Sequence, residues 1–350
     1  MATYKGKKIF ECDLSANNPS RKKYLDCIND FIEKKFAESV GIRDDFAKDI
    51  AFQQEEYRKK FVEMIGQPVV PYPDDIPNVK KTFLGKDDFC DIYRLEIEVM
   101  PDFWFWGLFM VPFNVKKAPL VIAQHGGWST PEICSEFLGN SNYNFFTKRA
   151  LERGMAVFVP QLLLWKLDFD TCERQEMLDI KFDRGRIDRR LKMLGLSITG
   201  LEVFCIRRSI DYLHSLDYID RDRTGMMGAS YGGYFTLHTA AADPRIKSIY
   251  AVAFFNDRSR DGCYDWFYTD AAYTFFDAEV AALCAPRRLQ IDVDKKDTVF
   301  DFAHVDGEAE RAARYYAKFG ASDSFRFTLH ESGHRFDESE KGFEFFFDGI

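Results

Sequence analysis

The sequence lacks the features of a membrane-spanning or secreted protein. No apolar run approaches the roughly 18 residues that a membrane helix needs, and the first residues, MATYKGKKIFECD, contain no apolar core of a secretory signal. An excess of positive charge is also missing, because 56 acidic residues outnumber 48 Lys and Arg residues and give a net charge of -8. Since a nucleic-acid binder needs a basic face for the phosphates, we expect a cytoplasmic protein with neither a membrane nor a nucleic acid as partner.

Paired cysteines are absent as well. The eight cysteines are scattered along the chain without any Cys-x-x-Cys spacing. A disulfide framework or a zinc knuckle needs regular spacing, whereas scattered cysteines are typical of reduced, buried thiols, so we assign them no chemistry. Aromatic residues, by contrast, make up 16% of the chain, which is enough to supply both a core and an apolar substrate cleft.

The first part of the chain has a helical pattern. Apolar residues recur at helical spacing over residues 20–41 and again over residues 46–66, which predicts two amphipathic helices. The proline-rich segment 68–77 (PVVPYPDDIP) then interrupts the pattern. We therefore expect a helical extension over residues 1–75 and a second domain over residues 76–350.

From residue 82 onward the pattern changes to that of an α/β domain. Residues 93–99 alternate and residues 103–113 form a second strand-like run, so we expect an antiparallel pair. Strands and helices then alternate, which predicts a parallel sheet with helices on both faces. The expected strands are 118–124, 155–160, 224–227, 246–254, 288–293 and 324–329, and the expected helices are 144–153, 197–216, 231–242 and 338–347. The charged segment 161–195 is irregular and is expected to cross the mouth of the sheet.

The motif GASYG (228–232) places Ser230 between an expected strand and an expected helix. Glycines on both sides of a serine permit a sharp turn that exposes the hydroxyl at the carboxyl edge of the sheet. A serine hydroxyl needs a neighbouring base to act as a nucleophile. The start of the following helix points its free N–H groups toward the same place, so the Tyr231 N–H is a candidate donor to an oxyanion.

The second oxyanion donor is expected from HGGW (125–128), which ends the strand 118–124. Its small residues let backbone N–H groups face the site, and we favour the Gly127 N–H over a simple tight turn. Trp128 follows directly and is predicted to contact substrate. The aromatic insertion after residue 254 could form a lid or a wall of the cleft, and we expect Trp266 to contact substrate from there.

Several aspartates could orient the base. Asp297 is the favoured acid because it lies on the loop beyond the strand 288–293, whereas Asp292 lies inside that strand and Asp294 at its edge. Asp257, which follows the preceding strand, is the alternative. A carboxylate just past the end of a parallel strand can reach an imidazole at the same edge of the sheet.

The base is predicted to be His334, in the segment HESGH (330–334). This segment also matches the zinc-binding pattern H-E-x-x-H, in which His330 and His334 would hold the metal and Glu331 would act as the base. That arrangement requires a helix, but alternating apolar residues lead into His330 as a strand, and Gly333 would lie inside the helix. We therefore expect no metal here, and a general base at His334 on a loop.

In chain order the candidates run Ser230, Asp297, His334, the order of α/β-hydrolases. From about Thr82 the chain resembles the α/β-hydrolase superfamily, and IDRDRTGMMGASYGGY (219–234) is similar to its acetyl xylan esterase, dienelactone hydrolase and prolyl oligopeptidase branches. The resemblance implies an eight-stranded, mostly parallel sheet, an acyl-enzyme, and neither a metal nor an organic cofactor. Asp294 departs from it, because a glycine is common at that place.

Members of the prolyl oligopeptidase group usually carry a large β-propeller, whereas the 80 or so residues that precede the domain here have a helical pattern. This difference favours a carboxylic ester hydrolase for short-chain acyl esters, such as acetyl esters, of a small molecule or a saccharide. The alternatives are a serine peptidase of the prolyl oligopeptidase type and a non-catalytic binding protein with the same fold. The sequence leaves the substrate and the formation of an oligomer open.

Overall fold

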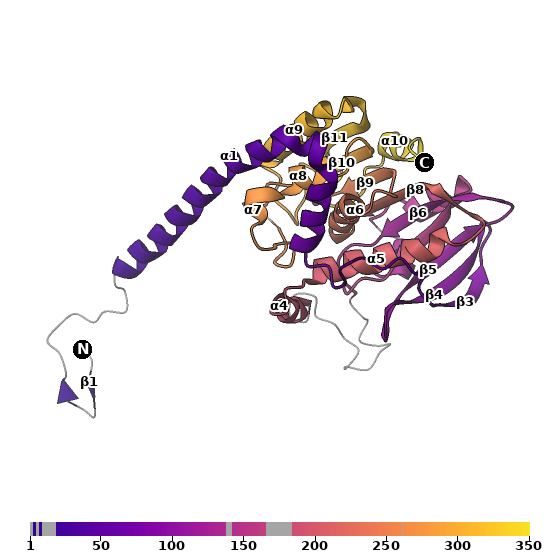
Figure 1. The fold of residues 1–350 in the computed structure, drawn as a ribbon, viewed down its shortest axis with the longest axis horizontal. Helices are drawn as coiled ribbons and strands as arrows, with labels where there is room; N and C mark the ends of the chain where they lie inside the picture. Colours follow the sequence, from indigo (N-terminus) through magenta and orange to yellow (C-terminus); the bar gives the residue numbers. More distant parts are fainter. Residues whose placement is uncertain (1–2, 5–6, 9–18, 138–141, 166–183, 261) are drawn as a thin grey trace.

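The computed structural model describes residues 3–4, 7–8, 19–137, 142–165, 184–260 and 262–350. Its centre is a nine-stranded sheet in the order β11-β10-β9-β8-β6-β7-β5-β4-β3 (Figure 1). The strands of this sheet are β3 (Val79–Lys86), β4 (Cys90–Met100), β5 (Phe103–Pro112), β6 (Ala118–Gln124), β7 (Ala156–Pro160), β8 (Ile219–Ala229), β9 (Ser248–Val252), β10 (Arg288–Asp294) and β11 (Phe325–His330). A separate antiparallel pair joins β1 (Thr3–Tyr4) to β2 (Lys7–Lys8).

Ten α-helices lie in the described part of the chain: α1 (Pro19–Met64), α2 (Pro131–Cys134), α3 (Phe146–Glu152), α4 (Gly185–Lys192), α5 (Ile198–His214), α6 (Tyr231–Ala242), α7 (Ala271–Thr274), α8 (Asp277–Ala282), α9 (Val305–Lys318) and α10 (Lys341–Phe347). Much of the charged segment that we expected to cross the mouth of the sheet, residues 166–183, lies outside the described residues.

The sheet is mostly parallel. The strands β7, β6, β8, β9, β10 and β11 run parallel to one another, whereas β5, β4 and β3 pair antiparallel along one edge. The expected number of strands was eight. The ninth is β3, which pairs with β4 in the register Val79↔Ile97 and extends that edge.

Two separate cores cover the two faces of the sheet, as β6 shows. Leu120 and Ile122 belong to a cluster that contains residues of α5 and α6, whereas Val121 and Ala123 belong to a second cluster with residues of α3 and α10. Successive side chains of a strand point to opposite faces, so a strand buried on both faces is apolar at every position. This arrangement confirms the predicted α/β fold with helices on both faces.

The predicted pair of N-terminal helices corresponds to two helical parts of α1 that meet at a kink. The backbone of α1 leaves helical geometry at Gln53 (φ -118°, ψ 19°), and not at Gly41, where we expected the first helix to end. An exposed glycine inside a helix costs about 1 kcal/mol relative to alanine, which is too little to end a helix of this length. In the described part of the chain, no helix combines the length and the apolar character needed to cross a membrane.

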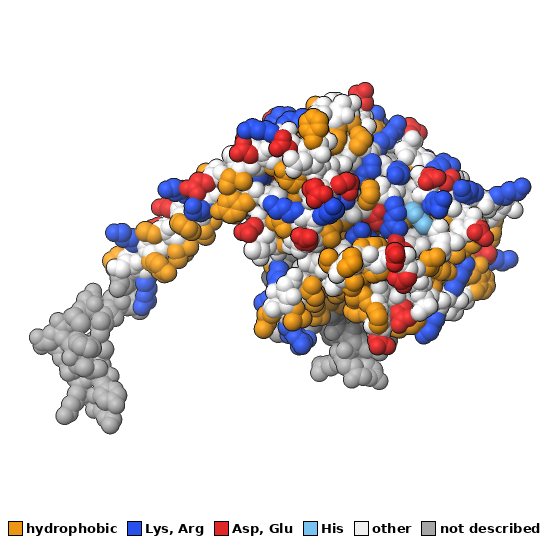
Figure 2. Space-filling model, in the orientation of Figure 1, with side chains coloured by type: hydrophobic (Ala, Val, Ile, Leu, Met, Phe, Trp, Pro, Cys, Tyr) orange, Lys and Arg blue, Asp and Glu red, His pale blue; other side chains and the backbone are white. Residues whose placement is uncertain are grey.

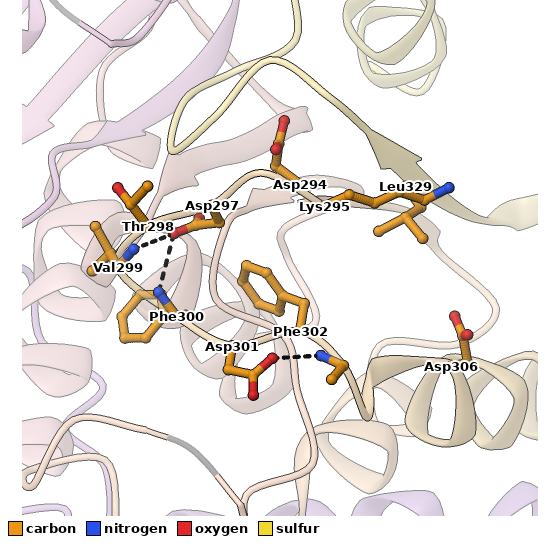
Figure 3. A pocket seen from close by; sticks show the side chains of 11 residues that line it. Asp294, Lys295, Asp297, Thr298, Val299, Phe300, Asp301, Phe302, Asp306 and Leu329 are labelled. Atoms are coloured by element: carbon orange, nitrogen blue, oxygen red, sulfur yellow. Dashed lines mark hydrogen bonds between the residues drawn. The ribbon is translucent and has the colours of Figure 1, made fainter.

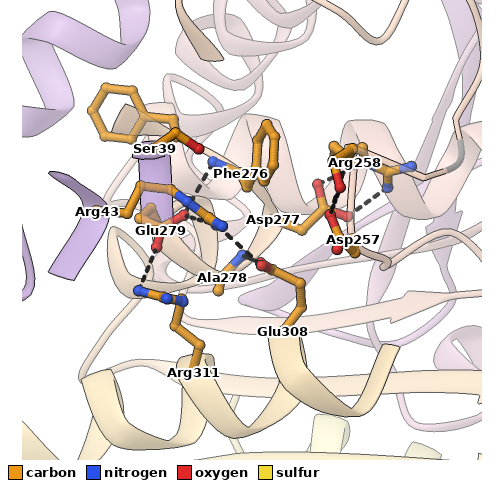
Figure 4. Close-up of polar contacts among 12 residues, drawn as sticks. Ser39, Arg43, Asp257, Arg258, Phe276, Asp277, Ala278, Glu279, Glu308 and Arg311 are labelled. Atoms are coloured by element: carbon orange, nitrogen blue, oxygen red, sulfur yellow. Dashed lines mark hydrogen bonds and ion pairs between the residues drawn. The ribbon is translucent and has the colours of Figure 1, made fainter. Parts of the chain in front are cut away.

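Buried ion pairs attach the middle of α1 to the rest of the molecule (Figure 4). The guanidinium of Arg43, only 4% exposed, lies 3.2 Å from Glu279 of α8 and 3.0 Å from Glu308 of α9. The part of α1 before this anchor projects from the body and carries exposed apolar side chains (Figures 1 and 2). These side chains are Tyr24, Leu25, Ile28, Phe31, Ile32, Val40 and Ile42.

Candidate active site

Ser230 occupies a sharp turn between β8 and α6. Its backbone has φ 60° and ψ -125°, a combination that non-glycine residues rarely adopt and that costs about 1–3 kcal/mol. The surrounding chain has no room for side chains, because a Cβ on Gly232 would lie 2.2 Å from the Gln124 carbonyl oxygen and one on Gly228 would lie 2.5 Å from the Gly232 carbonyl oxygen. The two glycines of the motif are therefore needed for β6, β8 and α6 to pack together around the serine.

Ser230 opens into a cavity of about 570 Å³. Its lining residues are Gly126, Gly127, Trp128, Asn142, Tyr143, Ala229, Ser230, Tyr231, Gly262, Cys263, Val299, Phe300 and His334. An adjoining groove of about 670 Å³ shares Val299 and Phe300 with this cavity and is lined by acidic side chains such as Asp301 and Asp306 (Figure 3). Ser230 and His334 thus line one cavity.

His334 is held by Asp297. The imidazole Nδ1 donates to Asp297 Oδ2 at 2.6 Å. The other carboxylate oxygen accepts from the Val299 and Phe300 amides at 2.7 and 3.0 Å (Figure 3). Burial acts to raise the pKa of the Asp297 carboxyl. The hydrogen bonds from His334 and from the two amides outweigh burial, so the pKa lies below its usual value and the carboxylate is charged at neutral pH.

The other candidate acids lie elsewhere. Asp257 accepts hydrogen bonds from the amide and the hydroxyl of Ser259, at 2.9 and 2.7 Å. Asp292 accepts one from the Tyr250 hydroxyl at 2.6 Å inside the sheet. Among the three, only Asp297 contacts His334 in the described part of the chain.

The turn that follows β6 brings a second set of backbone donors to the cavity. Gly126 donates its N–H to the Tyr143 hydroxyl at 2.6 Å, which leaves Gly127 as the glycine of this turn that can face a ligand. The Tyr231 N–H belongs to the first turn of α6, where amides have no partner within the helix. The two predicted oxyanion donors thus come from residues that both line the cavity with Ser230.

His125 anchors the same turn. Its Nδ1 donates to the Gly126 carbonyl at 2.8 Å, and its Nε2 accepts from the Leu162 amide at 3.0 Å. The imidazole is fully buried, and burial lowers its pKa to about 4. His125 is therefore neutral at physiological pH and acts as a structural acceptor.

A buried network behind Tyr231 could not be predicted from the sequence. The Tyr231 hydroxyl donates to Asp265 at 2.7 Å, Asp265 pairs with Arg184 at 2.6 Å, and Arg184 pairs with Glu202 at 2.7 Å. Arg184 is fully buried. The network holds the Tyr231 ring through its hydroxyl group. Its members lie far apart in the sequence and match no motif.

The two tryptophans expected to contact substrate occupy different environments. Trp128 lines the cavity and is 66% exposed. Trp266 is only 2% exposed, stacks on Tyr234 at 4.7 Å between ring centroids, and is not among the lining residues. The prediction that Trp266 contacts substrate was therefore wrong, because the insertion packs its tryptophan against α6 and behind Phe300, whose ring lies 5.3 Å away.

The geometry required by a zinc site is missing from the HESGH segment. His330 is the last residue of β11, and the following residues form a turn, so His330 and His334 do not share a helix face. The Nδ1 of His330 lies 2.8 Å from Asp294 Oδ2, and Glu331 pairs with Lys296 at the surface. The pattern H-E-x-x-H thus arises here on a strand and a loop.

The strand order and the serine at the turn between β8 and α6 define an α/β-hydrolase fold. Solved structures share it. A putative acetyl xylan esterase from Bacteroides fragilis matches with a TM-score of 0.62 at 15% identity, covering 81% of this chain and 76% of that one. A glucuronoyl esterase from Solibacter usitatus matches with a TM-score of 0.58 at 16% identity, covering 85% and 91% of the two chains.

Sequence comparison points to the same superfamily. Residues 206–304, which include Ser230 and Asp297, match the model of the prolyl oligopeptidase family. The chain is also 28% identical over 159 residues to the "Putative hydrolase YtaP" of Bacillus subtilis, over 43% of this chain. The chain thus spans about half of that relative's length, 53%. The resemblance to the α/β-hydrolase superfamily is confirmed, and the matches support a hydrolase of the serine type.

Proposed function

We propose that the protein is a serine-dependent carboxylic ester hydrolase that acts through an acyl-enzyme on short-chain acyl esters, such as acetyl esters of carbohydrates. One observation carries the proposal: Ser230, held in a strained turn, and His334, hydrogen-bonded to Asp297, line the same cavity. A serine, a base and an orienting acid on three separate loops are what acyl transfer requires.

In this proposal the Ser230 Oγ attacks the ester carbonyl carbon and gives its proton to Nε2 of His334. The Asp297 carboxylate holds Nδ1 at 2.6 Å, which fixes the tautomer and stabilises the imidazolium. The negative charge on the former carbonyl oxygen is stabilised by the Tyr231 and Gly127 N–H groups. His334 then returns the proton to the leaving alcohol, and a water molecule hydrolyses the acyl-enzyme by the reverse route.

The lining of the cavity supports an uncharged substrate. Its walls are formed largely by aromatic and apolar side chains such as Trp128, Tyr231 and Phe300, and the described lining residues include no Lys or Arg. A buried carboxylate on the substrate would have no cationic partner among them, and an unpaired buried charge is costly. The cavity volume of about 570 Å³ accommodates a small acyl group together with part of an alcohol.

A peptidase is the second candidate, and the match of residues 206–304 to the prolyl oligopeptidase family favours it. The names of the structural relatives, acetyl xylan esterase and glucuronoyl esterase, favour the ester. The same serine chemistry can cleave esters and amides, so the two functions are distinguished by whether the protein releases an alcohol or an amine. Short-chain p-nitrophenyl esters, acetylated sugars and aminoacyl arylamides offered in parallel make the distinction.

The experiment combines this substrate panel with labelling by a fluorophosphonate. We expect label on Ser230 and hydrolysis of the esters, with Ser230→Ala lowering turnover by about 10⁴ to 10⁶ and leaving the fold intact. The matched control is Ser259→Ala, whose hydroxyl contacts Asp257 away from the cavity. Inert protein that binds a ligand would indicate a binding module, and activity lost to a chelator and restored by metal would overturn the mechanism.

A further inference from the structure

A second Asp–His pair lies beside the first one. Asp294 and His330 are the last paired residues of the parallel ladder between β10 and β11. Their side chains meet at 2.8 Å, between Asp294 Oδ2 and His330 Nδ1. Both are buried: the side chain of His330 is 8% exposed and that of Asp294 is 0% exposed. The chain continues three residues from Asp294 to Asp297 and four residues from His330 to His334.

The Asp294 carboxylate connects the two segments that carry Asp297 and His334. One oxygen accepts from the amide of Gly333, the residue before His334, at 2.6 Å. The other oxygen accepts from the amide of Lys296, the residue before Asp297, at 2.5 Å. A backbone bond from the Lys295 amide to the His330 carbonyl, at 3.0 Å, joins the same segments. Hydrogen bonds to a carboxylate are about twice as strong as neutral ones.

The imidazole of His330 makes its shortest polar contact with Asp294. Its Nδ1 faces the carboxylate, whereas its buried Nε2 has no hydrogen-bond partner among the described residues. The ring has a second, longer polar contact, from the Ser332 amide to Nδ1 at 3.4 Å, so Asp294 is the nearer of the two polar groups that hold the ring in this position.

We propose that Asp294 and His330 are positioning residues that hold His334 against Asp297 and toward Ser230. The inference rests on the proposed function, since His334 is the general base only there. It assigns a role to His330, the histidine of the HESGH segment that does not act as the base, and to the aspartate that it contacts. Neither residue is among the described residues that line the Ser230 cavity, so the pair is proposed to act through His334.

The kinetic test compares Asp294→Asn with Glu331→Gln. Glu331 is the matched control because it also links the two segments, through Lys296 at 2.8 Å, but both side chains are at least 60% exposed and such pairs contribute little. We expect Asp294→Asn to lower kcat for p-nitrophenyl acetate about 10- to 100-fold with KM changed less than about threefold, as for the loss of an orienting contact. Glu331→Gln should retain kcat within about twofold.

Rescue by a conservative variant separates positioning from stability. His330→Asn places an amide N–H close to where Nδ1 lies, so it should retain kcat within about threefold, whereas His330→Leu should lose as much as Asp294→Asn. The proposal would be overturned if all folded variants had the wild-type kcat, or if Asp294→Asn and His330→Leu changed KM and left kcat unchanged.

A spectroscopic readout keeps the inference testable if the protein hydrolyses nothing. The proton shared by His334 Nδ1 and Asp297 should give a far-downfield ¹H NMR signal, identified by its loss in Asp297→Asn. Asp294→Asn should shift or broaden this signal although Asp297 is intact, and Glu331→Gln should leave it in place. An unchanged signal in Asp294→Asn refutes the positioning role, whereas an inactive wild-type protein with a shifted signal refutes only the proposed function.

Discussion

The buried imidazole of His125 predicts a loss of stability in mild acid. Its Nε2 accepts from the Leu162 amide and lies 3.2 Å from the Gln161 side-chain nitrogen, so a proton on Nε2 would face donors in an apolar interior. Burial lowers the pKa from 6.5 to about 4. At pH values between these two pKa values, His125 is protonated in the unfolded chain but neutral in the folded protein, so the free energy of unfolding falls as the pH falls. From pH 7 to pH 5 this linkage amounts to about 2 kcal/mol.

The measurement is urea unfolding of the wild-type protein and of His125→Gln at pH 7 and pH 5. Other titrating groups contribute equally to both proteins, so the difference between them isolates His125. We expect the variant to be less stable at pH 7, and this deficit to shrink by about 2 kcal/mol at pH 5. His304→Gln, which removes an exposed histidine, is the control and should show the same small difference at both pH values. A deficit for His125→Gln that does not change with pH would refute the reasoning.

Two further predictions follow from the packing of the site. Gly232→Ala should unfold the protein or destabilise it by more than about 2 kcal/mol, because its Cβ would meet the Gln124 carbonyl at 2.2 Å; thermal unfolding checks this, and a change below 1 kcal/mol or so contradicts it. Trp128→Ala should raise KM for aromatic esters about 10-fold, because the substitution removes a side chain that lines the cavity. The control in the same assay is Trp104→Ala, which replaces an exposed tryptophan of β5. Equal KM values in both variants would exclude Trp128 from substrate contact.

The sequence predicts the main strands and the serine turn because these depend on local patterns. The short apolar run of β6 is typical of a strand buried on both faces, and the glycines around Ser230 are typical of a sharp turn. The structure places both as expected. The predicted end of the first N-terminal helix, at Gly41, is different. A glycine at position 41 is a local signal, but contacts with α8 and α9 hold the helix through it, and tertiary packing overrides such weak preferences.

The surroundings of the site depend on residues that are distant in the sequence. The choice among aspartates near the end of β10 requires the register with β11, which sets Asp294 opposite His330 and leaves Asp297 to reach His334. The sequence of the aromatic insertion does not indicate whether its side chains point into the cleft or into the core. Trp266 therefore fits a cleft wall and a core equally well, and only the stacking on Tyr234 decides.

The alternation along β6 limits how this protein can change in length. Val121 and Ile122 pack into the cores on opposite faces of the sheet. Deleting one residue from β6 would therefore turn the side chains on one side of the deletion to the opposite face, and would shift the HGGW turn by one residue relative to β8. Insertions in the connections between elements carry no such penalty. Evolution of new specificities on this scaffold should therefore proceed by lengthening and shortening loops, while the strand lengths remain constant.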